Sequence, residues 1–99
     1  MSAHVSINRH QLADFCHRHH IRKLALFGSV LRDDFRPDSD VDVLVEFEPD
    51  HVPGLAFFVM QEELAQLVGR KVDLNTPQFL SRYFRDDILA TAQVQYVKG

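Results

Sequence analysis

Two short apolar runs, joined by a Gly-Ser corner and an acidic turn, constrain the fold of this chain more than any other feature. The first run, Lys23–Phe27, ends directly in Gly28-Ser29. The second run, Val41–Phe47, alternates valine with acidic or leucine side chains, which is the two-residue period of a β-strand with one buried face. We therefore predict two strands that meet at the Gly-Ser corner.

Two aspartates, Asp40 and Asp42, stand at the start of the second run. Side chains at positions i and i+2 leave a strand on the same face, with Cα atoms roughly 6.6 to 7 Å apart. Two such carboxylates repel each other unless they are solvated at a strand end or neutralised by a hard cation that prefers oxygen ligands. Mg²⁺ is the cation that fits this pair best.

The Gly28-Ser29 corner supplies the complementary half of a site. Glycine lets the backbone approach a ligand closely, and successive main-chain N–H groups with a serine hydroxyl hold phosphate oxygens. A phosphate site beside paired acids suits phosphoryl or nucleotidyl transfer, in which the protein mainly positions groups and neutralises charge.

At these residues the sequence resembles a known family. Gly28-Ser29, ten intervening residues and Asp40-Val41-Asp42 match the signature of the polymerase-β-like nucleotidyltransferase superfamily. The stretch 24–47 is similar to the smallest branch, the minimal nucleotidyltransferases, many of which are encoded beside a helical HEPN-domain ribonuclease toxin. The resemblance implies a third acid on a later strand, and Asp73 is in the expected place.

The resemblance also implies the fold and the activity. The expected fold is α/β, a small mixed β-sheet of three or four strands packed with helices, with residues 1–99 as a single domain. The implied activity is Mg²⁺-dependent transfer of AMP from ATP to a protein hydroxyl, typically a tyrosine of the cognate HEPN toxin. The chain would then be the antitoxin of a type VII-like toxin–antitoxin pair.

The implied site residues fall into two groups. The catalytic and metal-binding residues, holding two Mg²⁺ ions, are Asp40, Asp42 and Asp73. The residues expected at the nucleotide phosphates are Gly28, Ser29, Arg32, Arg36 and Ser39. The family often has a basic residue at the position of Val30 and a glycine at that of Asp33, and these departures weaken a detailed contact map for the triphosphate.

Composition bounds the answer independently. With 99 residues, 45% of them apolar and 25% charged, the chain is long enough for one small folded domain. A net charge of −3 argues against nucleic acid as the main ligand. The lone Cys16 and the lack of a signal pattern or long apolar run indicate a reducing cytoplasm and no membrane span.

The remaining elements follow from local signals. We expect a first helix from the Asn8 cap to about His19, a loop at 48–54 and a long helix over Leu55–Val68 that ends at Gly69. We also expect a short helix over 30–35, a strand over 70–75, one or two helical segments to about residue 92 and a last edge strand at 94–97. The apolar residues of the late helical segments that we expect to point into the core are Phe79, Leu80, Phe84, Ile88 and Leu89. The histidines around residue 19 lack the spacing of a zinc site, so we assign none.

The start of the long helix is apolar nearly all round. Six apolar residues stand in sequence over 55–60, more than one buried face requires. We predict that this region, with Tyr83 and Phe84, contacts a toxin protomer or a second copy of the chain.

Three alternatives stay open on the sequence alone. The acceptor of the nucleotidyl group could be RNA or a small molecule. The chain could be an antitoxin that neutralises its partner by binding alone. It could also be a structural α/β domain whose acids are incidental, which the joint spacing of the motifs argues against.

Overall fold

A computed structural model describes residues 7–31, 36, 39–51 and 53–98, and at Ser29 and Phe79 it describes the backbone alone. The helices and strands, with two 3-10 turns labelled η, are α1 (Arg9–Arg18), β1 (Ile21–Phe27), η1 (Gly28–Leu31), β2 (Val41–Phe47), α2 (Ala56–Val68), β3 (Val72–Asn75), η2 (Pro77–Phe79), α3 (Arg82–Thr91) and β4 (Gln93–Val97). The short helix expected over 30–35 lies partly outside the described residues.

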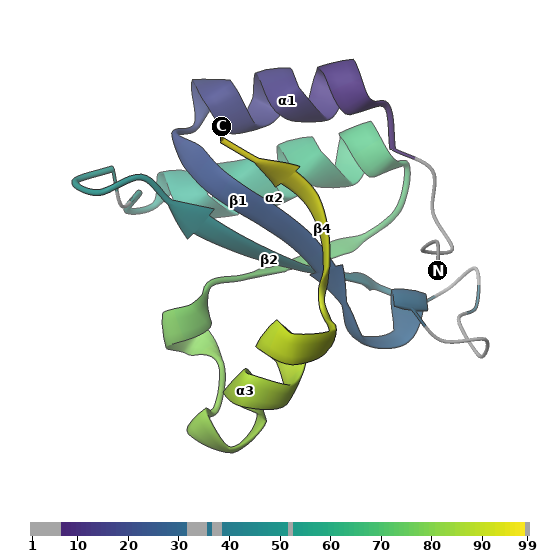
Figure 1. The fold of residues 1–99 in the computed structure, drawn as a ribbon. Coiled ribbons are helices and arrows are strands. Elements are labelled where there is room, and N and C mark those ends of the chain that lie inside the picture. Colours follow the sequence, from purple (N-terminus) through teal and green to yellow (C-terminus); the bar gives the residue numbers. More distant parts are fainter. Residues whose placement is uncertain (1–6, 32–35, 37–38, 52, 99) are drawn as a thin grey trace.

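The four strands form one mixed sheet in the order β3-β2-β1-β4 (Figure 1). β1 pairs antiparallel with β2 on one side and with β4 on the other, while β2 and β3 are parallel. A parallel pair needs a crossover connection, and α2 provides it. The expectation of a small mixed sheet with helices and a last edge strand is confirmed.

The two faces of the sheet are covered differently. α1 and α2 lie on one face, and α3 lies on the other (Figure 1). The valines of β2 point toward α1 and α2, as their alternation predicted. The buried core on that side consists of Leu12, Phe15, Cys16, Ile21, Leu24, Leu26, Val30, Val41, Val43, Val45, Met60, Leu64, Val72 and Leu74.

The ends of α1 are fixed by polar contacts. At its start, Asn8 Oδ1 accepts a hydrogen bond from the Gln11 N–H at 3.0 Å, which confirms the predicted cap. At its end, Arg18 and His19 both contact Glu63 of α2. The hydrogen bond from Arg18 lowers the pKa of Glu63. The polar residues at this helix end therefore tie α1 to α2.

α2 ends as the sequence predicted, because Gly69 adopts φ 79°, the left-handed conformation that glycine tolerates best. Its inward face, with Met60 and Leu64 buried, is also as expected. None of the helices in the described part of the chain is long and apolar enough to cross a membrane.

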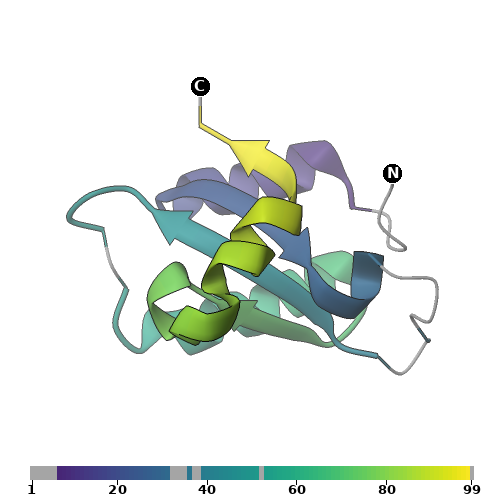
Figure 2. The same ribbon diagram turned by 60° about the horizontal axis from the view of Figure 1, so that its bottom comes forward.

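The expectation that Phe84 and Leu89 point into the core is wrong. Both side chains are exposed, and α3 has no buried residue. The backbone of Leu80 and Ser81 is extended, with ψ of 142° and 137°, so the helical segment breaks into η2 and α3. Figure 2 brings α3 in front of the sheet, on the face opposite to α1 and α2.

Candidate active site

Gly28, the residue that follows β1, lies directly against the carboxylate of Asp42. Gly28 adopts φ 76°, and a Cβ added there would overlap Oδ2 of Asp42 and lie 3.3 Å from its Cγ. The cause is the strand register, in which Phe27 pairs with Asp42 across β1 and β2. Both the backbone angle and the close approach of Asp42 therefore favour glycine at position 28.

Two of the three expected acids are neighbours in the sheet. Asp42 and Asp73 are Cα partners in the parallel pairing of β2 and β3, which corresponds to a spacing of about 4.8 Å between strands. They lie on the face away from α1 and α2, because the buried residues of each strand alternate with them. Asp40 precedes β2 and is exposed.

The acids do not form a tight cluster of three. In the described part of the chain, no three His, Cys, Asp or Glu side chains lie close enough together to hold a metal ion. A Mg²⁺ site does not need three, because this ion is usually bound by one or two carboxylates together with substrate phosphates. The donor set of carboxylates beside a glycine corner therefore fits Mg²⁺ that arrives with a nucleotide.

The turn before Asp40 is closed by Ser39. The Ser39 N–H donates to the Arg36 carbonyl at 3.0 Å, and Ser39 Oγ accepts from the Arg36 N–H at 3.1 Å. The Arg70 guanidinium donates to the same carbonyl. The Ser39 hydroxyl, expected at the phosphates, thus contacts the backbone of its own turn, and Arg36 is exposed.

The other two expected phosphate ligands are not fully described. Arg32 lies outside the described residues, and Ser29 is described only as part of η1, directly after Gly28. Their roles remain predictions from the sequence.

A groove of about 520 Å³ runs from the corner to α3. Its lining consists of Phe27, Gly28, Leu31, Asp42, Phe84, Asp87, Ile88 and Thr91. Sequence reasoning missed the contribution of α3, because the apolar residues of this helix were expected in the core. The signal available was the amphipathic pattern of residues 82–91, which is equally compatible with a groove wall.

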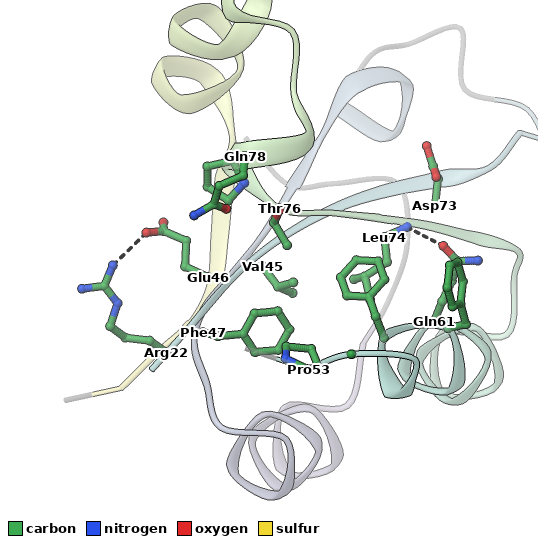
Figure 3. Close-up of a pocket in the computed structure, with 14 residues that line it drawn as sticks. Arg22, Val45, Glu46, Phe47, Pro53, Gln61, Asp73, Leu74, Thr76 and Gln78 are labelled. Carbon is green, nitrogen blue, oxygen red and sulfur yellow. Dashed lines mark hydrogen bonds and ion pairs between the residues drawn. The ribbon is translucent and has the colours of Figure 1, made fainter. Parts of the chain in front are cut away.

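A larger cavity of about 740 Å³ lies at the other end of β2, between η2 and the start of α2 (Figure 3). Phe47 and Phe57 meet there with ring centroids 6.5 Å apart. Gln61 Oε1 accepts from the Leu74 N–H at 2.9 Å, which satisfies a donor of the edge strand β3. Asp73 is on the lining, with its carboxylate on the opposite side of β3 from Leu74.

The apolar start of α2 is incompletely covered, as the sequence predicted. Phe57 packs against the core, whereas Leu55, Phe58 and Val59 are exposed. Tyr83 and Phe84 on α3 are exposed as well.

Comparison with known proteins identifies the class. The family described as nucleotidyltransferase domain matches residues 9–94. The chain therefore belongs to the nucleotidyltransferase domain family.

Curated relatives narrow the similarity. The chain is 44% identical over 55 residues to the protein adenylyltransferase MntA of Thermococcus cleftensis, a match that spans 54% of each chain. It is 31% identical over 75 residues to a Methanocaldococcus jannaschii protein assigned as a protein adenylyltransferase, covering 76% of this chain and 80% of that one. The chain thus spans only about half the length of the first of these relatives.

Solved structures share the fold. A structure assigned to the minimal nucleotidyltransferases is 33% identical, with a TM-score of 0.70 and 85% of each chain covered. A toxin–antitoxin structure with AMP-PNP has a TM-score of 0.73 at 18% identity, covering 93% of this chain and 75% of that chain. The complex of a tri-AMPylated Shewanella oneidensis HEPN toxin with its MNT antitoxin has a TM-score of 0.65 at 17% identity, covering 91% and 70%.

Proposed function

We propose that this chain transfers AMP from ATP to a hydroxyl group of a partner protein, a tyrosine of a cognate HEPN-domain toxin, and thereby acts as an antitoxin. The observation that carries the proposal is the strand register that sets Asp42 behind Gly28 and Asp73 beside Asp42. The name of the Thermococcus relative, protein adenylyltransferase, and the tri-AMPylated toxin in the Shewanella complex support the choice of reaction.

Each part of the site has a role in that reaction. The main chain at Gly28 and Ser29 seats the β and γ phosphates. Asp40 and Asp42 would hold Mg²⁺, which would neutralise the phosphate charge. The acceptor oxygen forms a bond to the α-phosphorus while the bond between the α-phosphorus and the bridging oxygen breaks, and pyrophosphate leaves. Asp73 takes the proton of the acceptor hydroxyl, since a carboxylate can serve as a general base.

A second candidate is neutralisation by contact alone. The exposed apolar residues at the start of α2 and on α3 favour it, since large exposed apolar patches mark interaction sites. Contact and AMP transfer can operate in one protein, so the experiment must separate them.

The test uses the purified chain, ATP, Mg²⁺ and its HEPN-domain partner, which the proposal expects in the neighbouring reading frame. Intact-mass spectrometry should detect AMP units on the partner with wild-type protein. Asp42→Asn should lower the transfer rate at least about a hundredfold, since it removes a charge from the reacting site. The matched control is Asp50→Asn, a change of an exposed aspartate in the loop after β2, which should leave the rate unchanged.

The outcomes distinguish the two functions. A toxin that is bound and inhibited by Asp42→Asn as well as by wild type, with no AMP added in either case, would replace AMP transfer by contact. Transfer at the wild-type rate by Asp42→Asn would remove this aspartate from the site.

A further inference from the structure

The groove that begins at Gly28 and Asp42 continues onto α3. We propose that its outer part is a nucleobase slot, in which Phe84 and Ile88 cover the base and Asp87 selects bases that carry an exocyclic amino group. The inference rests on the proposed function, whose phosphate site lies at one end of the same groove.

The size and lining of the groove suit a small ligand. Its volume of about 520 Å³ lies within the range of about 300 to 1,000 Å³ typical of ligand sites. The lining contributed by η1 and α3 is mostly apolar and includes Leu31, Phe84 and Ile88. Ligand sites combine such apolar walls with a few polar groups that fix orientation. A nucleotide with its phosphates at Gly28 would extend its base toward this wall.

The apolar face of α3 beside the groove is exposed. None of its residues is buried, and the Phe84 ring is 62% exposed although it lines the groove. A ten-residue helix is marginal in water unless its apolar face is covered. A planar base can stack on an aromatic ring and cover it, so nucleotide binding should also stabilise α3.

Asp87 gives the slot its selectivity. The Thr91 hydroxyl donates to the Asp87 backbone carbonyl at 2.8 Å. The hydroxyl proton of Thr91 is therefore already engaged within α3. An ionised aspartate only accepts hydrogen bonds. Adenine offers it an exocyclic amino group, whereas hypoxanthine offers a carbonyl oxygen at the same position. The slot should therefore prefer ATP to inosine triphosphate.

The first experiment titrates ATP and inorganic tripolyphosphate, each with Mg²⁺, into the full chain by calorimetry. Phe84→Ala should weaken ATP binding about five- to hundredfold, because one base–aromatic stack is lost. Tripolyphosphate has no base, so its affinity should not change. Phe58→Ala is the matched control, since Phe58 is 65% exposed and lies outside this groove. It should leave both affinities unchanged.

Three results would count against the slot or the function. Unchanged ATP affinity in Phe84→Ala would overturn the slot. Equal weakening of both probes would also overturn it, because the loss would then arise from the phosphate corner or the fold. If the wild-type chain binds neither probe, the proposed function itself fails, which is a different outcome from the first two.

The second experiment compares ATP with inosine triphosphate. Wild type should prefer ATP by about tenfold, the typical effect of one hydrogen bond to a charged group. Asp87→Asn should reduce this preference, since an amide can also donate to the carbonyl of hypoxanthine. Asp86→Asn, a change of the exposed neighbour on the same helix, should retain it. A preference that survives in Asp87→Asn would remove Asp87 from base selection.

Discussion

The two faces of the sheet differ in what covers them. Toward α1 and α2, side chains such as Phe15 and Leu64 are fully buried. Toward α3, Asp42 and Asp73 are register partners on the sheet, and no residue of α3 is fully buried. The closed face therefore provides most of the folding stability, and the open face keeps polar groups accessible to a ligand. Because successive side chains of a strand point to opposite faces, the buried valines of β2 lie on one face and Asp42 and Asp73 lie on the other.

The largest expected difference between the faces is in stability. Phe15→Ala should lower the free energy of unfolding by about 3 to 5 kcal/mol, because it removes a fully buried ring and leaves a cavity. Phe84→Ala should change it by less than about 0.5 kcal/mol, as exposed positions usually do. Urea unfolding measures both. Comparable losses in the two variants would mean that α3 belongs to the core.

Much of this separation could be predicted from the sequence. The alternation in Val41–Phe47 predicted that the valines of β2 are buried. Gly28 was expected to let the backbone approach a ligand, and the structure shows its close approach to Asp42, which the register of β1 on β2 fixes. Local patterns contain this information, since the period of a strand and the angles of a turn depend on nearby residues.

The placement of α3 could not be predicted in the same way. An amphipathic helix has an apolar face, but the pattern does not say whether that face meets the core or a groove. The extended backbone at Leu80 and Ser81 decides it. Ser81 is a recognisable helix cap, since its Oγ accepts from the Tyr83 N–H, but a cap marks where a helix begins and not which surface its apolar face meets. Asp40 is a similar case, because it lies before β2 and its distance from Asp73 depends on the whole sheet.

The second prediction concerns Gly28, at the corner that follows β1. Gly28→Ala should destabilise the chain by about 1 to 3 kcal/mol and abolish AMP transfer, because the methyl group would overlap Asp42 and φ is positive. Gly69 has nearly the same φ but open space around it. Gly69→Ala should therefore share the backbone strain and retain transfer. Thermal melts measure the backbone strain that both variants share, and the transfer assay reports the overlap with Asp42 that only Gly28→Ala creates. Equal activity of the two variants would contradict the close approach to Asp42.

The third prediction concerns the closed face at the start of α1. Asn8→Ala should cost about 1 kcal/mol, because the Gln11 N–H loses its side-chain acceptor. Asn8→Ser should recover most of this loss, since serine also caps helices well. Neither change should affect AMP transfer, because α1 lies on the face away from Asp42. Urea unfolding and transfer rates test it, and a loss of transfer in Asn8→Ala at full occupancy of the folded state would mean that the faces are coupled.

The smallest expected effect is a pH dependence of the closed face. Glu63 has a lowered pKa in the folded chain, mainly because Arg18 donates a hydrogen bond to it. A carboxyl whose folded pKa lies below its unfolded value stabilises the fold above the unfolded pKa, and this contribution disappears as the pH falls through the folded pKa. Wild type should therefore be more stable than Glu63→Gln at pH 7, and the difference should shrink below pH 4. Arg18 is exposed and Glu63 is half-buried, so solvent screening keeps the effect small. The midpoints of urea unfolding at pH 7 and pH 3 measure this difference in stability. Glu62→Gln, a change of an exposed neighbour on the same helix, is the control. A difference between wild type and Glu63→Gln that persists at pH 3 would show that Glu63 holds α1 to α2 through packing and not through its charge.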